Sequence, residues 1–202
     1  MARTLEFIFD FASPNAYLAW RALPDLLART GAELTITPCL LGGLFKATGN
    51  QAPMTAFAGI KGKLEYEALE TRRFIERHGL TRFRMNPHFP LNNLMAMRGL
   101  IAAQMEGRGD AYLEAVSVAT WEEGLKTDEP AVLGEVLDLA GLEGARLLAR
   151  TQEPAVKQAL IDNTERAAAR GAFGIPTFFV DGEIVYGKER LEQVERMLGA
   201  TD

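Results

Sequence analysis

Apolar and polar residues alternate over residues 4–9, near the start of the chain, and strict alternation predicts a β-strand. Ser13 followed by Pro14 then indicates a helix start, because a serine hydroxyl accepts a hydrogen bond from a free N–H of the first turn and proline fits the first helical position. We expect this helix to extend to about Thr30. Residues 33–37 alternate again, so the chain is predicted to open with strand, helix and strand.

Helical periodicity dominates the middle of the chain. Residues 42–53 contain three glycines and end in proline, which predicts a loop-rich segment. From residue 57 to about 148 apolar residues recur at helical spacing, and no strand pattern interrupts them. The helices expected there cover residues 61–78, 92–106, 110–123 and 129–140.

The pattern changes again after a helix predicted for residues 154–170. An apolar, β-rich run over residues 177–180 is followed by Asp181 and Gly182, a pair typical of a two-residue hairpin turn. Residues 183–186 are expected to pair back on that run. A last amphipathic helix is predicted for residues 188–198.

The order of these elements is βαβ, a helical block, then αββα. A βαβ unit followed by a helix and an antiparallel hairpin predicts an α/β, thioredoxin-like fold. Residues 1–44 and 155–202 would form one domain, and residues 45–154 an all-helical insertion after the second strand.

Composition narrows the possible functions. The chain has 202 residues, 48% of them hydrophobic and 24% charged, and a net charge of −5. No basic stripe interleaved with aromatic residues is present, which argues against nucleic acid as a partner. The longest apolar runs fall well short of the roughly 18 residues of a membrane span, and the apolar run 5–9 is too short for a signal peptide. A cytoplasmic location is therefore expected.

The chain has a single cysteine, Cys39, and two histidines, His78 and His88. One cysteine excludes an intramolecular disulfide, a dithiol redox pair and a structural zinc cluster. We expect Cys39 to be a small buried residue and expect no metal site.

The turn between the first strand and its helix is where a thioredoxin fold carries its reactive Cys-x-x-Cys motif. Here Ser13 occupies the position of the nucleophilic cysteine and Ala16 that of the resolving one, so disulfide exchange is excluded. What is left is a hydroxyl at a helix N-terminus, which favours an anion such as a thiolate. The alternative interpretation is that Ser13 only caps the helix.

A second motif lies near the other end of the chain, where Gly174, Ile175, Pro176 and Thr177 precede the hairpin. This pattern matches the loop that faces the active turn in thioredoxin folds, and its proline is expected to be cis. A cis Pro176 would leave the backbone of Ile175 free to pair with an extended peptide, and glutathione is such a peptide.

With these two segments as its specific parts, the chain resembles the 2-hydroxychromene-2-carboxylate isomerase family, whose relatives are kappa-class glutathione transferases and DsbA-type oxidoreductases. The resemblance covers nearly the whole sequence. The matching positions are residues 9–14, 17–19, 45–50, Lys63, Tyr66, 89–90, Asn92, 97–98, 173–179, 186–187 and 190–191.

The resemblance implies roles for individual residues. Ser13 would hydrogen-bond the sulfur of glutathione, and Ile175, beside Pro176, would pair with its cysteinyl unit. Lys46 would meet the carboxylate of a small aromatic substrate, with Asn50 near glutathione and substrate. The γ-glutamyl end of glutathione would be held by Tyr186, Gly187, Lys188 and Glu189.

Two of these positions depart from the family pattern. Glu189 stands where the family usually has an aspartate, and Lys188 replaces a small polar residue. The carboxylate of Glu189 can still meet the glutamyl ammonium, although with an extra methylene. The alternative is that Lys188 and Glu189 are simply a charged first turn of the last helix.

The resemblance implies a glutathione-dependent isomerase that acts on 2-hydroxychromene-2-carboxylate or a similar unsaturated aromatic keto acid, and it implies a homodimer. The implied reaction is reversible addition of the glutathione thiolate to the substrate. Two other functions stay open: a kappa-like glutathione transferase or peroxidase that uses the same site, and a non-catalytic DsbA-like binding protein.

Overall fold

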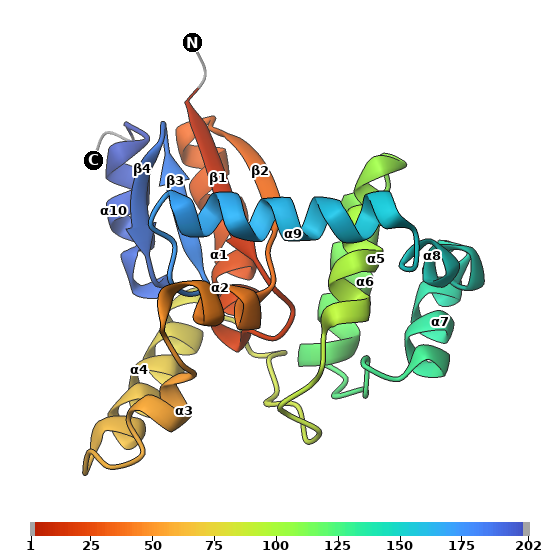
Figure 1. Cartoon of the computed structure of the whole chain (residues 1–202). Helices are drawn as coiled ribbons and strands as arrows, with labels where there is room; N and C mark the ends of the chain where they lie inside the picture. Colours follow the sequence, from red (N-terminus) through yellow and green to blue (C-terminus); the bar gives the residue numbers. More distant parts are fainter. Residues whose placement is uncertain (1–2, 200–202) are drawn as a thin grey trace.

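A mixed sheet of four strands lies at the centre of the computed structural model, which describes residues 3–199 (Figure 1). The strands are β1 (Thr4–Phe9), β2 (Glu33–Pro38), β3 (Thr177–Val180) and β4 (Glu183–Tyr186), and their order across the sheet is β2-β1-β3-β4. β1 is parallel to β2 and antiparallel to β3, and β3 is antiparallel to β4. The two ends of the chain therefore build one sheet, and the predicted thioredoxin-like fold is confirmed.

The described residues between β2 and β3 form the helices α2 to α9 and contain no strand. α1 lies between β1 and β2, and α10 follows β4. The bounds of all these helices are α1 (Pro14–Thr30), α2 (Leu41–Thr48), α3 (Pro53–Ala56), α4 (Lys63–His78), α5 (Leu94–Met105), α6 (Gly109–Trp121), α7 (Pro130–Leu139), α8 (Gly144–Arg150), α9 (Pro154–Ala169) and α10 (Leu191–Met197), and a 3₁₀ turn, η1, covers Lys188–Arg190.

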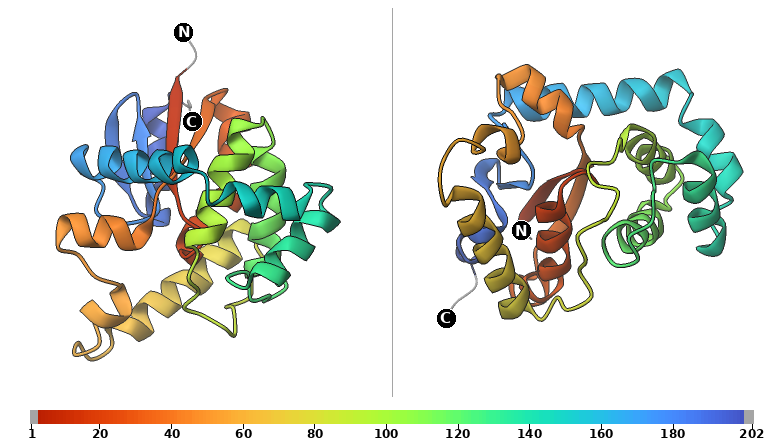
Figure 2. Two further views of the ribbon diagram at one scale, coloured as in Figure 1. Left: turned by 45° about the vertical axis from the view of Figure 1, so that its right-hand side comes forward. Right: turned by 90° about the horizontal axis from the view of Figure 1, so that it is seen from below.

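Helices cover both faces of the sheet. α1 and α10 pack together on one face, and α9 lies across the other face with α2 beside it (Figures 1 and 2). α9 then continues beyond the sheet to pack on α5, so one helix joins the sheet to the helical part. Because α9 belongs to both parts, the division of the chain at residues 45 and 154 stays a prediction.

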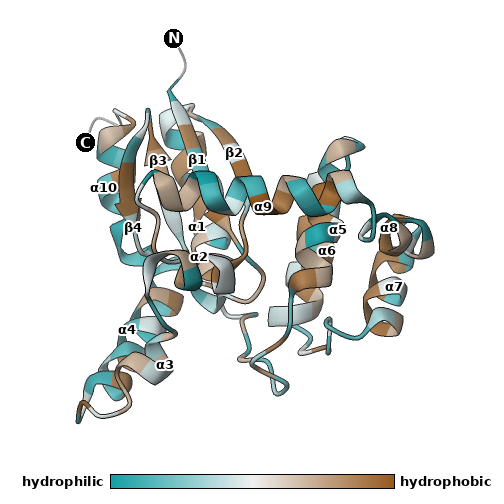
Figure 3. Cartoon of the chain, viewed as in Figure 1, coloured by the Kyte–Doolittle hydropathy of each residue, from teal (hydrophilic) through white to brown (hydrophobic). Residues whose placement is uncertain are grey.

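Aromatic side chains form the core where β1 meets the helices. The Phe7 ring stacks on Phe178 with 4.9 Å between centroids, and Phe9 packs edge-on against Phe11 at 5.0 Å. These four phenylalanines are fully buried, and brown, hydrophobic positions recur along the strands in Figure 3. The indole N–H of Trp121, at the end of α6, donates to the carbonyl of Phe11 at 3.1 Å, which fastens the helical part to the end of β1.

The prediction that residues 42–53 are loop-rich is wrong for the first part of this segment, because Leu41–Thr48 is the helix α2. Tertiary contacts stabilise it in spite of its glycines. The N–H of Leu41 donates to the carboxylate of Asp10 at 2.7 Å. Gly43 lies so close to α9 that a Cβ there would be 2.9 Å from the side chain of Thr164, so a glycine allows the two helices to meet. α3 and α8 were likewise not expected as separate helices.

Candidate active site

One edge of the sheet gathers the predicted site residues. The register places the end of β1 beside the end of β2, and the start of β3 beside the end of β4. Because β1 and β3 are antiparallel neighbours, all four of these strand ends lie at the same edge. The loops that leave this edge carry Ser13, α2, Ile175 and Gly187.

Ser13 is the N-cap of α1, and its hydroxyl makes two hydrogen bonds. It accepts from the N–H of Ala16 at 3.1 Å and donates to the carbonyl of Ile175 at 3.1 Å. The residue is 4% exposed. The expected capping bond is thus present, and the same hydroxyl joins the turn after β1 to the loop before β3.

The Ile175–Pro176 peptide bond is cis, which confirms the prediction. The Pro176 carbonyl accepts from the N–H of Gly187 at 3.0 Å, and the hydroxyl of Thr177 donates to the Gly174 carbonyl at 2.7 Å. The N–H of Ile175 donates to no acceptor within residues 3–199. Ile175, beside Ser13, therefore has a free backbone N–H and a carbonyl that accepts from the Ser13 hydroxyl.

Lys46 and Asn50 lie on and just after α2. The side-chain amide of Asn50 donates to the carbonyl of Phe173 at 2.8 Å, so α2 is tied to the loop that contains Ile175. Lys46 is exposed and makes no hydrogen bond or ion pair with the described part of the chain. Asn50 is therefore held in place by a hydrogen bond, whereas the Lys46 side chain is not.

The end of β4 and the 3₁₀ turn after it carry one partly exposed and one buried side chain of the predicted site. Tyr186 is 42% exposed and packs on the Phe173 ring, with 4.5 Å between centroids. Its partial burial, with Glu189 nearby, raises the pKa of Tyr186. Lys188 is only 2% exposed, because its ammonium pairs with Glu189 and lies 5.6 Å from the centre of the Phe74 ring on α4. The Lys188 ammonium thus contacts Glu189 and Phe74, and the Glu189 carboxylate already uses one oxygen for this ion pair.

Asp10 is a site residue that the sequence reasoning did not recognise. It is 1% exposed, and its carboxylate accepts from Ala12 at 2.8 Å and from Leu41 at 2.7 Å. Its carbonyl accepts from the N–H of Ser13 at 3.1 Å. Burial raises the pKa of Asp10 to about 6, although both hydrogen bonds act to lower it. The available signal was a carboxylate placed directly after a buried strand.

Comparison with known proteins agrees with this geometry. The family model of the DsbA-like thioredoxin domain matches residues 4–199. The chain belongs to the DsbA-like thioredoxin family. Among its relatives, 2-hydroxychromene-2-carboxylate isomerase of Pseudomonas putida is 28% identical over 197 residues, covering 96% of this chain and 94% of the relative. Glutathione S-transferase kappa 1 of Rattus norvegicus is 30% identical over 210 residues, covering 98% and 91%.

Solved structures of related proteins have the same fold as this chain. A structure of 2-hydroxychromene-2-carboxylate isomerase superposes with a TM-score of 0.82 at 26% identity, covering 97% of this chain and 94% of the other. The predicted resemblance is therefore confirmed for the family and the fold.

Cys39, the lone cysteine, takes no part in this DsbA-like site. It is fully buried, and its thiol donates to the carbonyl of Asn163 at 3.4 Å. Burial, with Asp10 and Glu6 nearby, raises the pKa of Cys39 to about 12, so the thiol is not poised for attack. Within residues 3–199 no group of three or more histidine, cysteine, aspartate or glutamate side chains is placed to hold a metal ion, and no helix has the length and apolarity to cross a membrane.

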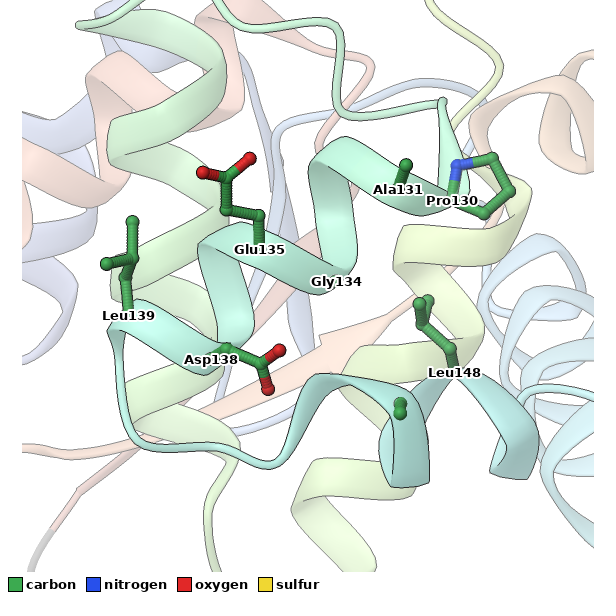
Figure 4. Close-up of a pocket in the computed structure, with 8 residues that line it drawn as sticks. Pro130, Ala131, Gly134, Glu135, Asp138, Leu139 and Leu148 are labelled. Atoms are coloured by element: carbon green, nitrogen blue, oxygen red, sulfur yellow. The ribbon is translucent and has the colours of Figure 1, made fainter.

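A wide hollow lies elsewhere, between α7 and α8 (Figure 4). Its volume is about 570 Å³, and it is lined by Pro130, Ala131, Gly134, Glu135, Asp138, Leu139, Ala145 and Leu148. None of the site residues borders it. The chemistry of the strand edge, rather than the size of a hollow, therefore identifies the candidate active site.

Proposed function

We propose that this chain is a glutathione-dependent isomerase that acts on 2-hydroxychromene-2-carboxylate or a similar unsaturated aromatic keto acid. The observation that carries the proposal is the hydroxyl of Ser13, which stands at the N-terminus of α1 and 3.1 Å from the carbonyl of Ile175. The isomerases of similar sequence, matched over nearly their whole length, support the choice of reaction.

The residues present fit a thiolate ligand. A free thiol with a pKa near 8.5 is only a few per cent ionised at pH 7. A helix N-terminus stabilises an anion by about 0.3–1 kcal/mol, and a hydroxyl bond to a charged group adds about 1.5–3 kcal/mol before desolvation. Because one unit of pKa corresponds to about 1.4 kcal/mol, the sum of about 2–4 kcal/mol from Ser13 and α1 would lower the pKa of the bound thiol by about 1.3–3 units, to about 7 or below.

Ser13 and Ile175 would act as a pair. Turning the Ser13 hydroxyl from the Ile175 carbonyl to a thiolate frees that carbonyl to accept from a peptide N–H, while the N–H of Ile175 is already free to donate. An extended peptide would thus receive two backbone hydrogen bonds at Ile175, beside Pro176. When bound, glutathione supplies a thiolate that adds reversibly to the unsaturated carbonyl system of the substrate and is afterwards released unchanged.

The remaining roles follow the strand edge. Lys46 would pair with the substrate carboxylate, and Asn50 would hold the end of α2 in place through Phe173. Tyr186 and Gly187 would border the γ-glutamyl end of glutathione, and Glu189 would meet its ammonium. Because the Lys188 ammonium is buried against Glu189, we propose that Lys188 orients that carboxylate rather than contacting glutathione itself.

A kappa-like glutathione transferase or peroxidase is the second candidate, and the 30% identity with the rat kappa transferase favours it. The two reactions differ in whether glutathione is consumed. The deciding experiment incubates the enzyme with trace glutathione and a large excess of 2-hydroxychromene-2-carboxylate, and follows both the ring-opened product and the free thiol. Many turnovers per glutathione at constant thiol support the isomerase, and a halt at one equivalent with loss of thiol supports the transferase.

S-methylglutathione in place of glutathione is the matched control, because it keeps the peptide and removes the thiol. Turnover that persists with it contradicts the thiolate mechanism. If the protein does not bind glutathione at all, the DsbA-like binding protein is the remaining candidate. A homodimer stays a prediction from the resemblance, and a cytoplasmic location stays a prediction from the shortness of the apolar runs.

A further inference from the structure

Asp10 is a buried carboxylate at the candidate active site, and the proposed reaction leaves it without a role. We propose that Asp10 is a positioning residue that connects the Ser13 turn to the first turn of α2. It would thereby fix the position of Lys46, on the substrate side of the site, relative to Ser13, which would bind the glutathione sulfur. The inference rests on the proposed function, because the two sides are defined by Ser13 and Lys46.

The two oxygens of Asp10 hold different segments of the chain. Oδ1 accepts from Ala12, next to Ser13, and Oδ2 accepts from Leu41, the first residue of α2. Of the side chains of this size, a carboxylate offers two acceptor oxygens, whereas an asparagine offers one acceptor and one donor. Only an acid can therefore satisfy both N–H groups from this place.

Asp10 is costly for folding, which points to a role other than stability. A buried carboxylate loses its hydration, and an apolar residue is often at least as stable in such a place. The carboxylate faces no cation within hydrogen-bonding or ion-pairing distance in residues 3–199, and its partners are the two N–H groups. The gain is geometric: the turn of Ser13 and the helix that carries Lys46 share one rigid link.

α2 has other tethers, so loss of this link would shift the helix without releasing it. The N–H of Leu40 donates to the hydroxyl of Thr164 on α9 at 3.0 Å, and Asn50 holds the far end through Phe173. Gly43 packs closely on Thr164. A change at Asp10 is thus expected to alter the position of Lys46 relative to Ser13 while the fold remains.

The first test is Asp10→Asn, in which the new amide N–H₂ faces a backbone N–H. We expect kcat per folded molecule to fall by about 10²-fold, the effect of a misplacement near 1 Å, while the Kd of glutathione and the KM of the aromatic acid change little. Hydrogen exchange at the Leu41 and Ala12 amides, followed by NMR, should become faster at one or both.

The second test severs the same link from the other side. Leu41→Pro removes the donor at a position where proline suits a helix start, and Leu40 already has the extended conformation, with φ −83° and ψ 113°, that precedes proline. Leu41→Ala is the matched control, because it truncates the side chain and keeps the N–H. In the double variant, Asp10→Asn no longer meets a donor at residue 41, so the combined loss should be smaller than the product of the single losses.

Three outcomes would overturn the proposal: unchanged kcat in Asp10→Asn, kcat and binding that fall together with the folded fraction, or losses that multiply in the double variant. Failure of the proposed function is recognised separately, because the wild-type protein would then show no glutathione-dependent turnover. In that case amide exchange still tests the link, and unchanged exchange at both amides in Asp10→Asn refutes it.

Discussion

Replacing Ser13 tests the centre of the proposed site, and its cost to stability can be worked from two hydrogen bonds. Ser13→Ala removes the cap to Ala16, which costs about 0.5–2 kcal/mol. It also leaves the carbonyl of Ile175, a residue only 5% exposed, without its donor, which adds about 1–3 kcal/mol. For a chain of this length each kcal/mol lowers Tm by roughly 2–4 °C, so the summed cost of about 1.5–5 kcal/mol corresponds to a fall of about 3–20 °C.

Activity should fall much further than stability. If the Ser13 hydroxyl acts as a preorganised donor to a thiolate, its removal lowers glutathione-dependent kcat by about 10²–10³-fold. Ser13→Gly is the matched control, because glycine is a good N-cap and costs only a few tenths of a kcal/mol in that role. The glycine variant should therefore be more stable than the alanine variant and equally inactive.

The assay measures thermal unfolding by circular dichroism and turnover at saturating glutathione, well below both unfolding transitions. A Ser13→Ala protein that keeps full turnover would refute the proposed role and leave Ser13 as a helix cap. A glycine variant that is active while the alanine variant is not would show that loss of the fold, rather than of the hydroxyl, explains the effect.

Three further predictions concern buried groups. Burial raises the pKa of Asp10 from 3.8 to about 6, so the stability that the protonated carboxyl contributes is present below pH 4 and is lost as the pH rises through 6. In urea unfolding, the wild type should lose about 3 kcal/mol relative to Asp10→Asn between these two pH values. Parallel stability curves for the two proteins would contradict this. The thiol of Cys39, whose pKa burial raises to about 12, should resist alkylation at pH 7 until denaturant is added, and rapid labelling of the native protein would disagree. Glu122→Ala should cost about 1–3 kcal/mol in denaturant unfolding, because the Tyr17 hydroxyl loses the acceptor that it bonds at 2.7 Å, whereas Arg21 keeps its ion pair with Glu114 at 2.9 Å. A cost below that of Glu122→Gln would refute the reasoning.

Sequence alone determined the parts of this protein that local chemistry controls. The alternation over residues 4–9 and the Asp181–Gly182 turn predicted β1 and the β3–β4 hairpin, because strand period and turn conformation depend on near neighbours. Ser13 before Pro14 located the start of α1, and the cis bond at Pro176 was expected from the motif around it. The pairing of these two distant motifs predicted the family.

Only the tertiary structure decided the features that depend on distant partners. α2 forms because Asp10 accepts its first N–H and Thr164 packs on Gly43, contacts that span far more residues than any sequence window. The burial of Lys188 follows from Phe74 on α4, which no spacing near residue 188 could reveal. Periodicity reports which face of an element is apolar, whereas the depth of a charged side chain depends on what folds over it. For that reason Asp10, which looked like the mere end of an apolar run, became visible as part of the site only in three dimensions.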